Sequence, residues 1–345
     1  MKFILPFLFF TTPLLAQVCT ESTLTSSLYP LNCDSLEINS PVDLRNITVP
    51  IRINVSGNVI INSTINISGQ NGGLLTSDGN GGQGGPGAFN GGGIELFEAA
   101  PGKDVPHGGA RGERDFSVNC GDGAAGGGFV LAGNNGTPCL NSTNPPSTGG
   151  VVYDLTNIET ILSGGHGGGA GGIFEINPTV SAASGGGGGG ALHLTAIGNI
   201  QLTSRAFISA NGGNGANSIN SNGGGGGGSG GVIILEGNTL DLQGKLFARG
   251  GKGGQAPNGG HGGDGSSGLI RLKDSNGVVD YIGEKDFTPE KKPDSQELKL
   301  NSSISCGTID SNNDGNGGNL LFQVLLPLFF LIAMTHFKKK FQDLV

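Results

Sequence analysis

The 345-residue chain contains no tryptophan, only three tyrosines and only 13% charged residues. Large aromatic side chains dominate the core of an ordinary globular domain, so their scarcity argues against a thick core. A narrow core of small aliphatic side chains needs none of them. Lysine and arginine number 19 against 27 acidic residues, for a formal net charge of −8. Because nucleic acids and anionic membrane surfaces attract basic proteins, we expect neither as a partner.

Sequence motifs for common cofactors are missing as well. The five cysteines form no Cys-x-x-Cys pair and no cysteine–histidine cluster with zinc spacing. The glycine runs lack the Lys-Ser/Thr of a phosphate-binding loop, and no helical pattern follows them. We therefore expect no cofactor.

Glycine, in contrast, is abundant, with 69 residues, and it is periodic. The run 185–190 recurs as 223–228, and the segment 210–215 recurs as 248–253, both at an offset of 38 residues. A fixed period of this size is typical of stacked structural repeats. The glycine period is lost over residues 276–319, which are rich in charge and proline and are predicted to be a spacer.

Short apolar segments alternate with the glycine runs. Residues 51–55 alternate apolar and polar side chains and are rich in β-branched residues, which predicts a strand. A second pattern, two small residues followed by a strand, recurs six times, at 92–96, 127–131, 171–176, 189–194, 230–235 and 267–272. One such unit cannot bury its apolar face alone, so we expect stacked units that share a core. The glycine runs either pack closely as extended, polyproline-II-like segments or form flexible loops.

The pattern GGGGGG-ALHLTAIGNIQLTSRAFISANGGNG resembles the glycine-rich right-handed β-helix repeats of large bacterial surface proteins, most clearly over 185–272. The resemblance implies an all-β fold, a right-handed parallel β-helix or solenoid over 51–275, after an amino-terminal cap at 17–50. Residues 97–126 and 132–165 depart from the period and are predicted to be inserted loops, which are frequent binding surfaces of solenoids. That group includes adhesin-like and cell-envelope proteins, and the resemblance implies no catalytic activity.

The amino terminus predicts export. Residues 1–16 have the pattern of a secretory signal peptide, with Lys2 ahead of the apolar stretch Phe3 to Leu15 and a cleavage site after Ala16. A lipoprotein modified at Cys19 and a retained membrane anchor are the alternatives.

The carboxyl terminus predicts membrane attachment. Residues 320–337 are apolar and just long enough to span a bilayer, and the basic tail 338–345 would lie on the cytoplasmic side. With Cys306 and Gly317-Gly318 ahead of the span, the arrangement resembles bacterial tripartite sorting tails. This resemblance implies cleavage by a rhomboid-type protease, and a plain single-span anchor is the alternative.

Export makes disulfides permissible. Cys19 and Cys33 bracket one short segment and Cys120 and Cys139 another, so we predict these two local pairs and leave Cys306 single. Other pairings remain open, since sequence alone does not fix connectivity.

Two side-chain sets are candidates for chemistry. Polysaccharide lyases and hydrolases need carboxylates that converge on one groove, and the first insertion supplies acidic residues near two arginines: Asp104, Glu113, Asp115 and Asp122, with Arg111 and Arg114. The alternative is that these charges only solvate a loop, and we assign no catalytic residue.

His166 and His261 share the frame Gly-Gly-His-Gly-Gly and would bind a metal if their corners stacked. Two ligands are too few for a site. Residues 259–264 match the start of a calcium-binding nonapeptide repeat, but no tandem copy follows. We therefore predict no metal site.

Taken together, these features predict an exported, surface-anchored structural or adhesive envelope protein without catalytic activity. Its partner would be a polysaccharide or another cell surface, and its carboxyl-terminal segment would contact the membrane. The alternative is a carbohydrate-active enzyme on a β-helix scaffold. An ice or mineral binder ranks third, because it needs a flat array of repeated Thr or Asp.

Overall fold

The computed structural model describes residues 17–26, 28–77, 79–95, 98–104, 106–174 and 182–287, all within one compact unit, Met1–Glu290. The regular elements described are strands, apart from one helix, α1 (Glu21–Ser26). The all-β prediction is therefore confirmed.

The predicted terminal segments fall outside this part of the chain. Residues 1–16, the proposed span 320–337, the tail 338–345, Cys306 and Gly317-Gly318 are not among the described residues. Within the part that is described, no helix is long and apolar enough to cross a bilayer.

Three sheets, which we call the strand stack, hold most of the strands. In hydrogen-bonding order, the first is β2 (Leu31–Cys33), β5 (Ile51–Val55), β14 (Ala191–Ala196), β17 (Val232–Glu236), β20 (Leu269–Asp274) and β21 (Gly277–Ile282). The second is β1 (Val18–Cys19), β3 (Ser35–Ile38), β6 (Val59–Ile61), β15 (Asn199–Leu202) and β18 (Thr239–Leu242). The third is β4 (Val42–Asp43), β7 (Thr64–Asn66), β16 (Phe207–Ser209), β19 (Lys245–Phe247) and β22 (Glu284–Asp286).

The chain visits the three sheets in the same order again and again. It runs through β2, β3 and β4, then β5, β6 and β7, then β14, β15 and β16, and then β17, β18 and β19. Each strand pairs in parallel with its counterpart in the next round, as Ile61 does with Leu202. The sheets are nevertheless mixed, because β21 and β22 turn back and pair antiparallel with β20 and β19.

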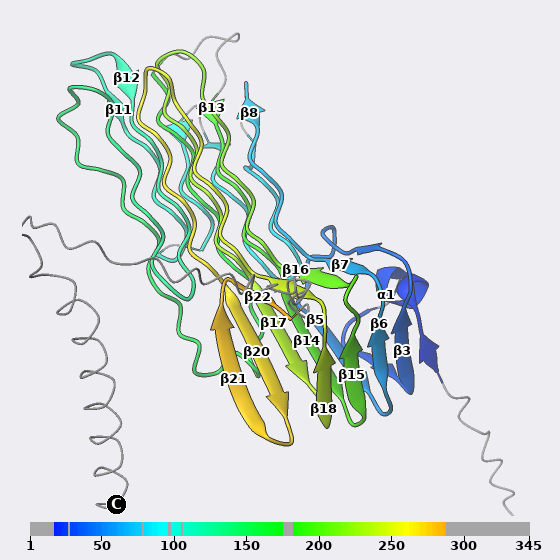
Figure 1. Cartoon of the computed structure of the whole chain (residues 1–345). Coiled ribbons are helices and arrows are strands. Elements are labelled where there is room, and N and C mark those ends of the chain that lie inside the picture. Colours follow the sequence, from blue (N-terminus) through cyan, green and yellow to red (C-terminus); the bar gives the residue numbers. More distant parts are fainter. Residues whose placement is uncertain are drawn as a thin grey trace, which may run out of the picture. The chain divides into compact units, whose positions relative to one another are not determined.

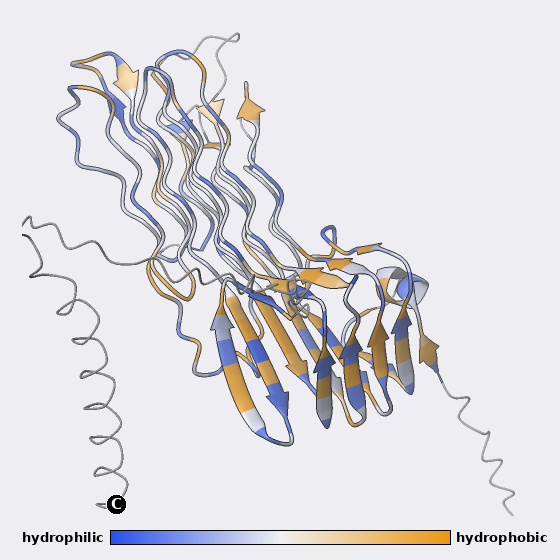
Figure 2. Cartoon of the chain, in the orientation of Figure 1, coloured by the Kyte–Doolittle hydropathy of each residue, from blue (hydrophilic) through white to orange (hydrophobic). Residues whose placement is uncertain are grey.

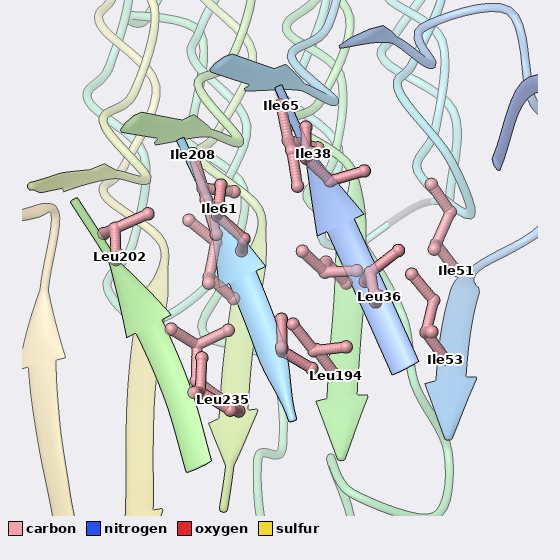
Figure 3. Close-up of a cluster of buried hydrophobic side chains, with 14 of the residues drawn as sticks. Leu36, Ile38, Ile51, Ile53, Ile61, Ile65, Leu194, Leu202, Ile208 and Leu235 are labelled. Atoms are coloured by element: carbon pink, nitrogen blue, oxygen red, sulfur yellow. The ribbon is translucent and has the colours of Figure 1, made fainter. Parts of the chain in front are cut away.

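The core of the strand stack lies between its sheets. The alternation seen in the sequence decides which side chains enter it: Ile51, Ile53 and Val55 of β5 are buried, and Asn54 points outward. Equivalent positions of successive rounds lie in register, as Ile38, Ile61 and Leu202 do (Figure 3). This column contains only isoleucine and leucine, so its side chains fill the core without an aromatic ring.

Between the third sheet and the first, the chain leaves the strand stack and returns. After β16 an outgoing segment, 210–218, is followed by a returning one, 222–231, and after β19 the same happens with 248–256 and 259–268 (Figure 1). The 38-residue period therefore comprises three strands and one glycine-rich excursion. After β7 the excursion lasts until β14 and contains the segments 81–93, 100–112, 121–136, 164–172 and 184–190. We call all these segments the glycine bundle.

The glycine bundle is held together by backbone hydrogen bonds between its segments. One ladder joins five of them to Gln70, shortly after β7: the amide of Gly187 donates to Gln70, Gly213 to Gly187, Gly228 to Gly213, Gly251 to Gly228 and Gly265 to Gly251, with N···O distances of 2.8–2.9 Å. The run 223–231 is buried throughout. The interior therefore consists of peptide groups that pair with one another, which removes the cost of burying them unpaired.

Close approach, not unusual backbone conformation, explains the glycines. Of the bundle's glycines only Gly87 has a positive φ. A Cβ atom built on Gly226 would lie 1.9 Å from the carbonyl oxygen of Ala125, far inside van der Waals contact. Figure 2 shows the bundle mostly in the pale middle of the hydropathy scale, whereas the strands of the stack alternate orange and blue.

Exposed side chains recur every third residue along the outgoing segments. The side-chain oxygens of Asn211, Asn214 and Asn217 accept hydrogen bonds from the amides of Arg249, Lys252 and Gln255, each 38 residues further on, at 2.8 Å. The residues between them, such as Gly213 and Ala216, are buried. A period of three is typical of the polyproline II helix, so close packing of extended segments, not a flexible loop, describes these runs.

Three features differ from the sequence-based expectation. The segment 17–50 contributes a full round of strands, β2 to β4, and the predicted spacer begins with β21 and β22. Of the six glycine–strand patterns, only the three at 189–194, 230–235 and 267–272 enter the first sheet, as β14, β17 and β20. The described residues of the first pattern, at 92–96, include only the two-residue strand β9 (Ile94–Glu95), which pairs with β10 (Glu98–Ala99) outside the strand stack. Residues 121–129, within and beside a predicted loop, are buried throughout.

Candidate functional site

The region between residues 97 and 165 carries most of the predicted site residues. It includes β10 (Glu98–Ala99), which pairs antiparallel with β9 just before the region, and the antiparallel pair of β11 (Arg114–Asp115) with β12 (Cys120–Gly121). A third such pair, β8 (Leu74–Leu75) with β13 (Ala182–Ala183), lies outside it. A surface groove of 490 Å³ opens in this region, and its lining includes Pro101, Pro106, Ala110, Arg111, Thr148 and Val151.

Arg111 is the charged residue of this groove, and two carboxylates hold it. Its Nη1 lies 3.3 Å from Oε2 of Glu98, and its Nε lies 3.2 Å from Oε1 of Glu113. The Arg111 side chain also donates to the carbonyl oxygen of Ala99, at 3.2 Å. The guanidinium is thus fixed beside an otherwise apolar lining, where it can donate to a bound hydroxyl or carboxylate.

Asp115 is buried, and hydrogen bonds from Ser117 and from the loop 137–144 engage both of its carboxylate oxygens. Its Oδ1 accepts hydrogen bonds from the amide and the hydroxyl of Ser117, at 2.8 and 2.6 Å. Its Oδ2 accepts from the Ser142 hydroxyl and the Thr143 amide, both at 2.9 Å. These donors stabilise the ionised form, the Ser117 hydroxyl most, and hold the pKa of Asp115 well below its usual range.

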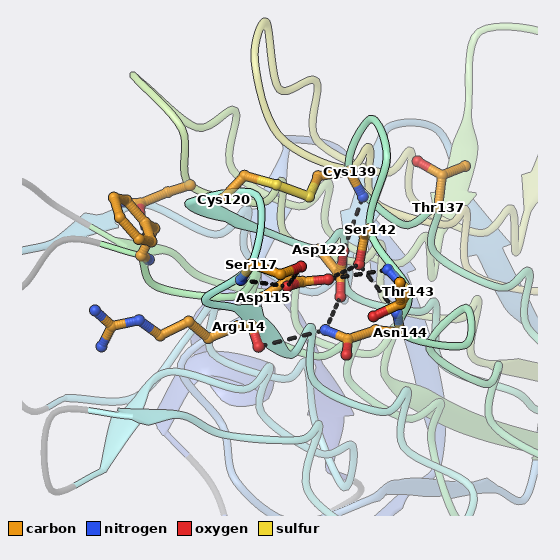
Figure 4. Close-up of a disulfide and its surroundings, with 12 residues drawn as sticks. Arg114, Asp115, Ser117, Cys120, Asp122, Thr137, Cys139, Ser142, Thr143 and Asn144 are labelled. Carbon is orange, nitrogen blue, oxygen red and sulfur yellow. Dashed lines mark hydrogen bonds between the residues drawn. A yellow bond between two sulfur atoms is a disulfide. The ribbon is translucent and has the colours of Figure 1, made fainter.

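Asp122 also accepts hydrogen bonds from the loop 137–144 (Figure 4). It is buried, its Oδ1 accepts from the amide of Cys139 at 2.8 Å, and its Oδ2 accepts from the side-chain amide of Asn144 at 2.7 Å. Cys120 and Cys139 form a disulfide across the same loop. The other local pair, Cys19 and Cys33, is also a disulfide and ties the first strands together.

The acidic residues of the insertion therefore do not converge on one groove. Asp115 and Asp122 brace the loop 137–144, and Glu113 pairs with Arg111. The guanidinium of Arg114 lies over the rings of Phe116 and Phe174, 4.2 and 5.3 Å from their centroids. Its side chain extends away from the two aspartates (Figure 4).

Replacing Asp115 with alanine is expected to loosen this loop. The change leaves two amides and two hydroxyls without their acceptor, so proteolytic cleavage near the exposed Leu140 should become several times faster. Limited proteolysis followed by mass spectrometry measures this rate. The matched control is Glu113→Ala, which removes an exposed carboxylate just before β11 and should leave the rate unchanged; equal rates in all three proteins would contradict the assignment.

The stabilisation of the loop 137–144 by Asp115 depends on pH in a way that follows from the lowered pKa of Asp115. Because the folded pKa of Asp115 is lowered, its stabilisation is complete above the unfolded aspartate pKa of about 3.9. It is lost only as the pH falls from there through the folded value. The loop is therefore expected to stay equally protected at pH 5 and pH 8.

The two histidines of the repeated frame lie in different surroundings. His261 is exposed, and its Nδ1 accepts a hydrogen bond from the amide of Ala256 at 3.0 Å. His166 is fully buried in the glycine bundle, and it lies beside Asp104 and His107. The sequence-based reasoning missed His107, for which the only signal is its position three residues after Asp104.

The calcium-like segment 259–264 is also accounted for by protein contacts. Asp264 pairs with the Nζ of Lys252 at 2.8 Å and accepts the amide of Gly253 at 2.8 Å. Its carboxylate thus serves to link the two arms of one excursion.

Comparison with protein-family models, with curated proteins and with solved structures finds no match for this chain. The function must therefore be argued from the residues themselves.

Proposed function

We propose that this chain is an exported, surface-anchored structural or adhesive envelope protein without catalytic activity, and that its strand stack is a right-handed β-solenoid. The repeated visiting order of the three sheets and their parallel pairing support the solenoid. Two disulfides suit an oxidising compartment outside the cytoplasm. The sequence of the two ends supports export and anchoring.

The observation that carries the non-catalytic part is the engagement of Asp115 and Asp122. A general acid or base must reach the proton it transfers, and a carboxyl group whose pKa is strongly lowered, as that of Asp115 is, is ionised at neutral pH, has no proton to donate and is a weak base. Both aspartates instead hold the backbone of the loop 137–144. We infer that this part of the insertion is shaped for rigidity.

Adhesion would use the groove beside Arg111. Apolar walls with one fixed arginine suit a sugar, whose ring carries C–H faces and hydroxyl groups. Arginine is also among the residues that contribute most to binding at interfaces. The glycine bundle keeps this surface rigid, which lowers the entropy lost on binding.

The alternative, a carbohydrate-active enzyme, would have to rely on Glu98 and Glu113. These two exposed carboxylates flank Arg111 beside the groove. They remain the acidic pair that such a mechanism would use.

A panel of polysaccharides separates the two proposals. The purified full chain is incubated with each one, and retained glycan and chain length are read by mass spectrometry. We expect retention of at least one polysaccharide at unchanged length, and a roughly tenfold loss of affinity in Arg111→Ala. Arg205→Ala, an exposed arginine between β15 and β16, is the matched control and should bind as the unmodified chain does.

Shortened polysaccharides would overturn the non-catalytic proposal. If a Glu98→Gln or Glu113→Gln variant no longer shortened them, the acidic pair would be identified. Retention that is equal in Arg111→Ala and the unmodified chain would place the binding surface elsewhere.

A further inference from the structure

Three side chains that can ligate a metal converge at the edge of the glycine bundle: Asp104, His107 and His166. Oδ2 of Asp104 lies 3.0 Å from Nε2 of His166 and 3.4 Å from Nδ1 of His107. The three ligating atoms all lie within 4.8 Å of one another. The residues come from two separate segments of the chain, so their meeting is a property of the fold.

The tautomer of His166 follows from its other nitrogen. Nδ1 lies 2.9 Å from the carbonyl oxygen of Gly128, which can only accept, so Nδ1 carries a proton. The side chain is fully buried, and this hydrogen bond fixes the orientation of its ring. With the proton on Nδ1, the lone pair of a neutral ring lies on Nε2, the nitrogen that faces Asp104.

Two ring nitrogens and one carboxylate oxygen face one another here. Nε2 of His166 and Nδ1 of His107 are buried, and neither has a hydrogen-bond partner. Both lie near one carboxylate oxygen, which is an acceptor when ionised. A cation placed between the three atoms would satisfy all of them.

The ligand spacing suits a small divalent ion. Zinc–nitrogen and zinc–oxygen bonds of about 2.0–2.2 Å in a tetrahedron place neighbouring ligand atoms roughly 3.3–3.6 Å apart. The 3.4 Å distance from Asp104 to His107 lies in this range, and the 3.0 Å distance from Asp104 to His166 is slightly shorter. The carbonyl oxygen of Gly128 supplies the outer hydrogen bond that metal-binding histidines usually make.

The surroundings are rigid on one side and open on the other. The rings of Phe89, Phe129 and Tyr153 lie 5.0–5.6 Å from that of His166, by centroid. The backbone amide of His166 donates to the Ser229 hydroxyl at 2.7 Å. The side chains of His107 and Asp104 are 24% and 34% exposed, so an ion can enter from solvent.

We propose that Asp104, His107 and His166 bind one divalent transition-metal ion, zinc being the best match, with the remaining coordination position taken by water. Two imidazoles and one carboxylate favour zinc and its neighbours over calcium or magnesium, which prefer oxygen ligands. The site would tie the segment around Asp104 to the segment 164–172 of the bundle. This inference does not depend on the adhesive function.

The test uses the purified full chain after chelator treatment and dialysis. Zn²⁺ is titrated by calorimetry, and Co²⁺ is added separately to record its visible absorption, which reports coordination by nitrogen and oxygen ligands. We expect one ion per chain. His107→Ala and Asp104→Asn should each lose affinity about 100-fold or more, since even the loss of an outer-shell partner costs about 10–100-fold.

The matched control is His261→Ala, which removes an exposed histidine in the same Gly-Gly-His-Gly-Gly frame and should bind as the unmodified chain does. Circular dichroism checks that each variant is folded. An unmodified chain that binds no stoichiometric Zn²⁺ or Co²⁺ would overturn the proposal and leave a plain histidine–aspartate contact. Unchanged affinity in His107→Ala and Asp104→Asn, or an equal loss in His261→Ala, would overturn it as well.

Discussion

Replacing Gly188 with alanine is expected to lower the free energy of unfolding by at least about 3 kcal/mol. The new Cβ atom would lie 2.1 Å from the carbonyl oxygen of Gly165 and 2.7 Å from the amide nitrogen of His166. These are backbone atoms of a neighbouring segment, so no side-chain rotation can relieve the contact. Separating the segments would also strain the hydrogen bond from Gly188 to Phe89. Valine at this position should be worse.

Thermal unfolding measured by calorimetry checks this prediction. A loss of about 3 kcal/mol corresponds to a fall in melting temperature of about 6–12 °C in a protein of this size. The matched control is Gly73→Ala, since a Cβ built on Gly73 meets nothing within 4 Å. If both variants melted at the temperature of the unmodified chain, close packing of the glycine bundle would be refuted.

In the strand stack, Ile208→Ala is expected to lower the free energy of unfolding by about 2–5 kcal/mol. Ile208 in β16 is fully buried and pairs in register with Ile65 on one side and Leu246 on the other. Truncation leaves a cavity between two stiff neighbours, and the stacked strands cannot move together to fill it. The cost should therefore lie in the upper part of that range.

Ile197→Ala provides the comparison, because Ile197 follows β14 and is 77% exposed. It should change stability by less than about 0.5 kcal/mol. Urea unfolding of the two variants gives both values. A small effect of Ile208→Ala would mean that the column of aliphatic side chains contributes little, and that the glycine bundle dominates the stability.

The strand stack was the more predictable part of the fold. Side-chain alternation marks β5, and aliphatic residues recur in β14 and β17, so pattern alone indicated strands and a shared core. The size of the glycine bundle was not predictable in this way. Gly121 donates to the carbonyl oxygen of Ser221 across a hundred residues, and glycine has no side chain whose pattern could indicate the partner.

The candidate site shows the same limit. Nearness in sequence suggested that Asp104, Asp115 and Asp122 act together, but the fold uses two of them to brace a loop and places the third beside His166. A shared frame suggested pairing His166 with His261, but identical neighbours do not imply equal burial. Which residues meet here depends on how the long excursion after β7 folds back, and local sequence carries little information about that path.

The glycine bundle also affects how stability changes with temperature. Its unfolding exposes many peptide groups and few apolar side chains, whereas unfolding of the strand stack exposes mainly isoleucine, leucine and valine. Newly hydrated apolar surface raises the heat capacity and newly hydrated polar surface lowers it. The bundle therefore adds little to the heat-capacity increment of unfolding, and its free energy follows a flatter curve. Cooling, which weakens apolar burial in the strand stack, leaves the contribution of the bundle largely intact.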